Sequence, residues 1–154
     1  MSYSPKNYVC PFCELAQGKD TIDGFSKAEF IVYKDTNTAA FISSHTWPHN
    51  AGNVLIIPNK HFENIYDITD NVLAQVYMTA KKVATAMKKI YGCDGVSMRQ
   101  HNEPAGNQNV WHFHVHVLPR YKNDDLYVNH KNKRLMTDDE RQYYAGKLKQ
   151  YFSK

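Results

Sequence analysis

Apolar positions in the first half of the chain form short runs separated by turn-forming residues, which is the pattern of β-strands. The runs at residues 30–33 and 38–42 follow one another closely and predict a β-hairpin. A loop over 43–52, rich in Ser, His, Pro and Asn, comes next. The apolar run 54–57 then predicts a buried strand that Pro58 stops. This half of the chain is therefore expected to consist of consecutive strands.

The pattern then changes to the period of an amphipathic helix. Thr69 or Asp70 can cap its N-terminus, and Gly92 can end it just after Tyr91 by taking a left-handed conformation. Apolar side chains recur at spacings of three, four and seven residues, so they share one face of this helix. They are Val72, Leu73, Val76, Tyr77, Ala80, Val83, Ala84 and Met87. We expect this face to pack on the sheet.

Two more strands and a second helix complete the predicted elements. The strands cover 96–100 and 111–118, the latter ended by Pro119, and the helix starts at about Thr137, where acidic residues favour an N-terminus. Strands, helix, strands and helix in this order, without regular crossovers, indicate an α+β fold with a mainly antiparallel sheet. Because no repeat or long linker divides the chain, we expect residues 1–154 to form a single domain.

Composition limits the possible partners and surroundings. The net charge of +4 suits an anionic substrate, but the only basic cluster is Lys131, Lys133 and Arg134, most simply a solvated loop, so no nucleic acid is expected. No run of about 18 apolar residues is present, and we expect no membrane contact. The polar start, Met1 to Tyr8, has no apolar signal segment, so a cytoplasmic location is expected. Because the cytosol is reducing, the three cysteines are not expected to form a disulfide framework.

Three histidines, His112, His114 and His116, alternate with apolar residues in the last predicted strand. Alternating residues of a strand share one face, so the imidazoles are expected on an exposed face and the apolar residues against the long helix. Chance is a poor explanation in a chain with eight histidines. One metal bound by all three also fits poorly, because the outer Cα atoms of a straight strand lie about 13 Å apart. The pattern favours histidines with different roles.

Cys10 and Cys13 form a C-x-x-C pair, which in the cytosol indicates zinc or a redox couple. A thioredoxin-like pair would lie in a βαβ unit, and the predicted elements contain none. Zinc needs two further ligands, for which histidine is a usual type, whereas Cys93 is better explained as a small apolar residue at a helix end. Spacing alone does not select the histidines, although His61 follows Pro58 at a strand end and is a good candidate.

Several motifs occur together in one order between residues 10 and 121. Residues 112–120 follow a His-x-His-x-His pattern with two apolar residues and Pro-Arg, as in many bacterial members of one family. Residues 56–61 resemble its apolar-Ile-Pro-Lys-x-His element, and 105–108 resemble the Ala-Gly-Gln loop that precedes its triad. The Cys10–Cys13 pair matches its zinc-binding branch. As a combination, these motifs resemble the histidine triad (HIT) family.

The resemblance implies a fold and roles for the triad. The fold would be a five-stranded antiparallel sheet with two helices, usually paired as a homodimer. His114 would be the nucleophile, and His116 would bind the phosphate and assist the leaving group. Neutral imidazole suits this chemistry, because its attack on phosphorus gives a covalent nucleotidyl-histidine intermediate. The resemblance also implies a structural Zn²⁺ with a closed ligand set: Cys10, Cys13, His61 and His112.

Nucleotide contacts are expected from polar residues near the triad and after the second strand. Gln108 and Asn109 could reach the phosphate, with Asn109 standing where the family often has Ser or Thr. Ser43 stands where most members have a ribose-binding Asp, and one hydroxyl cannot replace both carboxylate oxygens. Asn102 is favoured over its two preceding neighbours as the amide that opens the loop. The pattern leaves open whether three more histidines line the pocket: His45, His49 and His101.

We therefore expect an enzyme that hydrolyses or transfers the nucleotidyl group of a small, AMP-like nucleotide through His114. Nucleoside phosphoramidates or related monophosphate conjugates are the favoured substrates. Dinucleoside polyphosphate hydrolysis is the alternative, because Pro119-Arg120 also occurs in that branch of the family. Two alternatives of other classes are a nucleotide-binding regulatory module with little turnover and a zinc-dependent oxidoreductase or metal carrier. Nucleotide affinity without turnover would favour the first, and more than one zinc per chain would favour the second.

Overall fold

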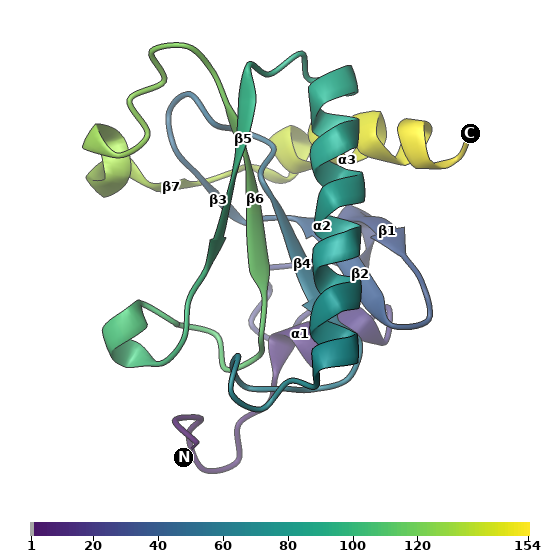
Figure 1. The fold of residues 1–154 in the computed structure, drawn as a ribbon, viewed down its shortest axis with the longest axis vertical. Coiled ribbons are helices and arrows are strands. Elements are labelled where there is room, and N and C mark those ends of the chain that lie inside the picture. Colours follow the sequence, from purple (N-terminus) through teal and green to yellow (C-terminus); the bar gives the residue numbers. More distant parts are fainter. Residues whose placement is uncertain (1) are drawn as a thin grey trace.

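The computed structural model describes residues 2–154 and is built around a five-stranded sheet (Figure 1). In the sheet the strands have the order β1-β2-β4-β6-β5, and all neighbouring pairs are antiparallel. The bounds are β1 Ile31–Lys34, β2 Thr38–Ile42, β4 Val54–Pro58, β5 Gly95–Gln100 and β6 Val115–Arg120. This confirms the α+β class and the five-stranded antiparallel sheet.

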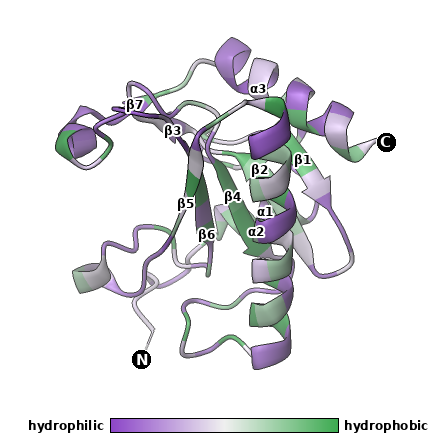
Figure 2. Cartoon of the chain, turned by 45° about the horizontal axis from the view of Figure 1, so that its top comes forward, coloured by the Kyte–Doolittle hydropathy of each residue, from purple (hydrophilic) through white to green (hydrophobic). Residues whose placement is uncertain are grey.

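Two long helices, α2 (Asp70–Ile90) and α3 (Asp138–Phe152), cover one face of the sheet (Figure 1). The predicted apolar stripe of α2 packs on β4 and β6, and α3 packs on β1 and β2. Figure 2 shows the apolar strands inside and polar residues on the outer side of α2. Thr137 caps α3: its hydroxyl accepts from the Glu140 N–H, and the Glu140 carboxylate accepts from the Thr137 N–H.

The opposite face of the sheet is partly covered by a short helix that the sequence pattern did not predict. This helix, α1, spans Pro11–Ala16 and begins with Pro at its first position, where proline is well tolerated. Phe12 and Leu15 pack on the apolar side chains of β2 and β4, including Phe41. The face that carries the triad is therefore enclosed, and His112 and His114 are buried rather than exposed as expected.

The strand that carries the triad starts later and ends later than predicted. It begins at Val115 rather than 111, because the preceding segment leaves the ladder and the Phe113 N–H donates to the Phe62 carbonyl. It continues through Pro119 to Arg120. The Pro119 carbonyl accepts from the Asn50 amide, so this residue's backbone polar groups face away from β5 and its missing N–H costs no ladder bond.

A second, two-stranded sheet joins β3 (His45–Thr46) to β7 (Arg134–Leu135). The first of these strands lies in the segment that was expected to be a loop. The pairing holds the stretch before α3 against the loop after β2, next to the triad face (Figure 1). Within residues 2–154, no helix is both long and apolar enough to cross a membrane.

Candidate functional site

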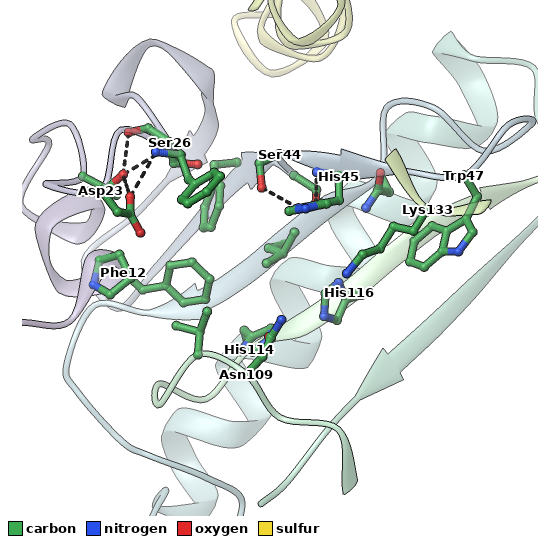
Figure 3. A pocket seen from close by; sticks show the side chains of 18 residues that line it. Phe12, Asp23, Ser26, Ser44, His45, Trp47, Asn109, His114, His116 and Lys133 are labelled. Carbon is green, nitrogen blue, oxygen red and sulfur yellow. Dashed lines mark hydrogen bonds between the residues drawn. The ribbon is translucent and has the colours of Figure 1, made fainter. Parts of the chain in front are cut away.

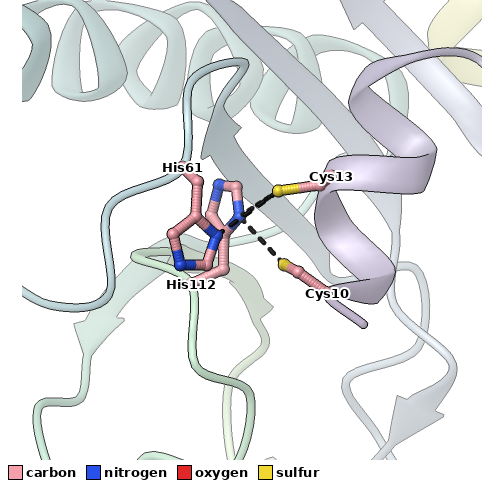
Figure 4. Close-up of side chains that lie close together, drawn as sticks. All are labelled: Cys10, Cys13, His61 and His112. Carbon is pink, nitrogen blue, oxygen red and sulfur yellow. Dashed lines mark hydrogen bonds between the residues drawn. The ribbon is translucent and has the colours of Figure 1, made fainter. Parts of the chain in front are cut away.

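Four potential metal ligands from three separate parts of the chain meet at the first histidine of the triad (Figure 4). Cys10 precedes α1 and Cys13 lies within it, His61 follows β4, and His112 precedes β6. One ligand atom of each residue lies within 4.8 Å of all the others. The structure thus brings together the whole predicted set, including the two histidines that spacing alone could not select.

The donor atoms fit a tetrahedral divalent ion such as zinc. His112 Nδ1 lies 3.2 Å from Cys10 Sγ, and His61 Nδ1 lies 3.3 Å from Cys13 Sγ. Tetrahedral zinc holds sulfur and nitrogen ligands about 3.5 Å apart. Burial and the neighbouring Cys10 raise the pKa of the Cys13 thiol to about 12, so a bound cation is needed to hold the Cys13 sulfur as a thiolate at neutral pH.

The orientation of the His112 ring also suits a metal. Its Nε2 lies 3.0 Å from the Pro58 carbonyl oxygen. Because a carbonyl oxygen can only accept, Nε2 carries the proton and Nδ1 presents its lone pair to the sulfurs. Metal-binding histidines commonly donate their other N–H to such a partner. Burial lowers the pKa of His112 to about 3, which keeps the ring neutral and able to coordinate.

A cavity of about 320 Å³ lies beside this cluster, on the face of the sheet opposite α2 (Figure 3). Four of the predicted site residues line it: His114, His116, Ser43 and Asn109. Phe12, Phe41 and Leu55 supply apolar surface to the same cavity. A pocket with apolar walls and a few converging polar groups is the usual form of a small-molecule site.

His114 presents the opposite ring nitrogen from His112. Its Nδ1 lies 2.7 Å from the His112 carbonyl oxygen and therefore carries the proton. Its Nε2 is left with a lone pair, in a residue that lines the cavity. Burial lowers the pKa of His114 to about 4, so the ring is neutral at pH 7. A neutral imidazole with a free Nε2 can act as a nucleophile.

His116 lies against two other imidazoles. Its ring centroid is 4.9 Å from that of His114 and 5.8 Å from that of His101. Burial holds the pKa of His116 well below its usual value, and the two histidines act in the same direction. The His101 Nδ1–H donates to the Gly106 carbonyl at 2.8 Å, so this ring is held by the loop before the triad. His101 thus packs beside the cavity-lining His116, and His45 is itself a lining residue.

Gln108 and Asn102 have a different environment from Ser43 and Asn109. The Gln108 amide donates to the Glu63 and Val110 carbonyls, and its oxygen accepts from the Glu103 N–H. Asn102 accepts from the Ile65 N–H and donates to Gln100. Neither lines the cavity. In the structure both amides tie the loop before the triad to the segment after β4.

The loop between Asn102 and Gln108 differs from the family pattern at one position, where its backbone is left-handed. Asn107, which stands where the family commonly has Gly, has a φ of +67°. Asparagine is among the residues that tolerate this left-handed region best. The loop can therefore keep its path despite the substitution.

The cavity also contains charged residues that sequence reasoning missed as site residues. Asp23 comes from the loop after α1, and Lys133 comes from the stretch just before β7. Two-residue strands are too short to show a periodic pattern, so nothing in the sequence placed Lys133 near the triad. The only signal was its membership of a small basic cluster.

Comparisons with known proteins show which sequences the chain resembles. The HIT domain family model matches residues 25–123. The chain is 32% identical over 118 residues to protein Hit of Bacillus subtilis, covering 75% of this chain and 74% of the relative. It is 24% identical over 125 residues to an adenylylsulfatase of Arabidopsis thaliana, covering 81% of this chain and 59% of the relative.

Two solved structures extend the similarity to the whole fold. A Hit-like protein involved in cell-cycle regulation from Bartonella henselae has a TM-score of 0.78 and 27% identity, covering 97% of this chain and 98% of the other. A Zn-bound histidine triad family protein from Mycobacterium smegmatis has a TM-score of 0.75 and 23% identity, covering 94% and 93%. The second likeness concerns the fold alone.

Proposed function

The chain belongs to the HIT domain family, and on this premise we propose that it hydrolyses or transfers the nucleotidyl group of a small nucleotide through a covalent intermediate on His114. The observation that carries the proposal is the free Nε2 of a neutral His114 at the cavity. HIT proteins bind nucleotides, and the relative from Arabidopsis thaliana is named an adenylylsulfatase. The cavity is also large enough for part of a nucleotide, at about 320 Å³.

The proposed reaction has two steps. His114 Nε2 forms a bond to the α-phosphorus while the bond to the leaving group breaks and its electron pair departs with that group. The Nδ1–H remains bonded to the His112 carbonyl, which stabilises the positive charge that the ring gains. His116, beside His114, binds the phosphate and assists the leaving group. Water then cleaves the P–N bond, or a second acceptor takes the nucleotidyl group.

Binding of the nucleotide uses the remaining predicted residues in two ways. Asn109 lines the cavity next to the triad and can donate its amide to the phosphate. Ser43 is buried at the cavity and offers one hydroxyl to the sugar. Gln108 and Asn102 act by holding the loop that carries Asn109, since their amides are already bonded to the backbone of Glu63 and Ile65 in the segment after β4.

We assign zinc to the Cys10, Cys13, His61 and His112 cluster, with a structural role. When bound, the ion supplies a closed four-ligand crosslink with no open position for water. The crosslink ties α1 to the segment that carries His114, so it supports the wall of the cavity. We predict one tightly bound zinc per chain and turnover that survives brief chelation, measured by metal analysis and by assay immediately after a chelator is added.

The test is single-turnover hydrolysis of adenosine phosphoramidate and of diadenosine tetraphosphate by wild type and His114→Ala. Wild type should cleave at least one, and the variant should be slower by orders of magnitude. His49→Ala is the matched control, because His49 lines a different pocket, and it should behave as wild type. If wild type binds AMP but cleaves neither substrate, the hydrolase proposal fails for them and a nucleotide-binding regulatory module takes its place.

Two further expectations concern the assembly and the location of the protein. A homodimer remains a prediction that sedimentation analysis would test. A cytoplasmic location remains a prediction that microscopy of the tagged protein would test. Neither affects the assignment of His114 as the nucleophile.

A further inference from the structure

Lys133 places a positive charge at one end of the cavity. It lines the cavity together with His114 and His116. Figure 3 shows its side chain extended toward His116. Within residues 2–154, no carboxylate lies within ion-pair distance of its ammonium group, whereas the adjacent Arg134 is paired with Glu140. The Lys133 charge is therefore available to a ligand.

The other end of the cavity carries the opposite charge. Asp23 lies near Phe12 and Ser26, on the far side of His114 from Lys133 in Figure 3. Its Oδ1 accepts from the Thr21 hydroxyl at 2.6 Å and from the Phe25 N–H at 3.0 Å, which holds the carboxylate in place. Among the residues that line the cavity, Asp23 is the only acidic one and Lys133 is the only lysine or arginine. A ligand with an anionic tail is therefore favoured with that tail toward Lys133.

A second cation strengthens the positive field at the Lys133 end. Arg99 of β5 is the register partner of His116. Its guanidinium lies 5.7 Å from the Trp47 ring and 5.0 Å from the Tyr127 ring, and Trp47 lines the cavity. One terminal nitrogen of Arg99 is buried and has no hydrogen-bond partner within residues 2–154. Lys133 and Arg99 thus both place positive charge near His116.

We propose that Lys133 binds the leaving group and selects nucleotides whose α-phosphate carries an anionic leaving group, such as sulfate or a phosphate chain, over those that carry an amine. This inference rests on the proposed function, in which His114 attacks the α-phosphorus. It names the class of substrate that the cavity favours, and it gives Lys133 a specificity-determining role that the family motifs do not contain.

The selection follows from how charge moves in the first step. The bond from His114 Nε2 to phosphorus forms, the P–O bond breaks, and its electron pair stays on the departing oxygen. The leaving sulfate or phosphate chain gains negative charge, which the Lys133 ammonium stabilises more in the transition state than in the ground state. An amine takes a proton from the solvent as the P–N bond to it breaks, so it leaves as a neutral molecule and gains no negative charge. Water then attacks phosphorus, the P–N bond breaks, and AMP and a proton are released.

The experiment compares kcat/KM of wild type and Lys133→Met on three substrates: adenosine phosphoramidate, adenylyl sulfate and diadenosine tetraphosphate. Met keeps the length of the side chain without its charge. We expect a loss of about tenfold or more for the two anionic leaving groups, the usual cost of losing a charge-assisted hydrogen bond, and less than about twofold for the phosphoramidate. Lys133→Arg should restore the preference. Lys131→Met is the matched control, because Lys131 does not line the cavity.

The losses of kcat/KM on the three substrates, taken together, test the inference. A loss confined to adenylyl sulfate or to the tetraphosphate supports the inference and identifies the leaving group. An equal loss on all three substrates, or none, overturns the inference while leaving the His114 reaction intact. A wild type that binds AMP but cleaves none of the three contradicts the proposed function and removes the inference with it.

Discussion

His112 and His114 lie on one short segment and present opposite ring nitrogens to their surroundings. His112 donates from Nε2 to the Pro58 carbonyl and turns Nδ1 toward two sulfurs. His114 donates from Nδ1 to the His112 carbonyl and keeps Nε2 for the cavity. The difference shows that a single carbonyl acceptor selects the tautomer of each imidazole, and with it the ring nitrogen that is free to bind a metal or a substrate.

Neighbouring histidines can serve a metal and a substrate separately, because each presents a different ring nitrogen. Phe12 of α1 packs edge-on against both rings, with centroids 5.9 Å from His112 and 5.3 Å from His114. This aromatic side chain separates the sulfur cluster from part of the cavity wall. We therefore expect substitutions on either side to affect metal binding and turnover in different proportions.

His114→Ala should have the largest effect on turnover and the smallest on the metal. Loss of a covalent nucleophile lowers kcat by roughly 10⁴-fold or more in comparable enzymes. The four proposed zinc ligands should keep their places, because His114 contributes no donor to that cluster. Rapid-quench kinetics and metal analysis of the same preparation check both statements. A variant that loses zinc as well as turnover would contradict the separation of the two sites.

His61→Ala should show the reverse pattern. Its ring is exposed, so its removal leaves little packing defect, but it takes away one of the four metal ligands. A bound ion at about a thousand times its Kd stabilises the folded state by about 4 kcal/mol, so loss of zinc should lower the free energy of unfolding by an amount of that order.

His61→Cys is the matched variant, because a thiolate can replace imidazole on zinc and should restore most of the stability. Urea denaturation with and without zinc in the buffer measures the difference. An unchanged dependence on zinc in His61→Ala would rule out His61 as a ligand.

Gln108→Ala tests whether an amide that lies outside the cavity still matters to it. The substitution leaves buried loop carbonyls and one N–H without their partner, which should cost about 2 kcal/mol of unfolding free energy. Turnover should fall through a higher KM, because the loop also carries Asn109. Denaturation and steady-state kinetics check the two effects. An altered KM with full stability would instead assign Gln108 direct contact with the nucleotide.

The smallest predicted effect is an acid dependence that involves neither site. Bonds from Arg134 and from the N-terminus of α3 lower the pKa of Glu140 from 4.5 to about 2. Since the folded-state pKa is the lower one, this stabilisation is present above pH 4.5 and is lost as the pH falls toward 2. The ion pair is partly exposed, so the loss should be about 1 kcal/mol. Glu140→Gln should abolish this part of the acid dependence of stability.

The parts of the fold that could be predicted well from the sequence have a clear local signal, such as a periodic pattern of apolar residues or a capping motif. The buried stripe of α2, including Val76, Ala80 and Val83, follows the helical spacing, so its position could be read directly. The capped start of α3 at Thr137 is equally local. The full set of proposed metal ligands and the proposed role of His114 could be predicted only because several motifs resemble one family in the same order.

Other parts of the fold depend on contacts between distant segments, which the sequence pattern does not reveal. Alternation continues back to residue 111, but the ladder of β6 begins at Val115, where its partner β5 ends at Gln100. The six residues of α1 are too few to show a helical period, so the burial of the triad face was missed. Lys133 reaches the cavity through the pairing of β7 with β3, a long-range contact between two-residue strands.

The measurement that tests the central claim most directly is a long-range ¹H–¹⁵N correlation spectrum of the imidazole rings in the zinc-loaded protein. Such a spectrum distinguishes a protonated ring nitrogen from one with a lone pair or a metal bond. The structure predicts Nδ1–H with a free Nε2 for His114, and Nε2–H with a zinc-bound Nδ1 for His112. His114 protonated at Nε2 near neutral pH would contradict the account, because no nucleophilic nitrogen would then face the cavity.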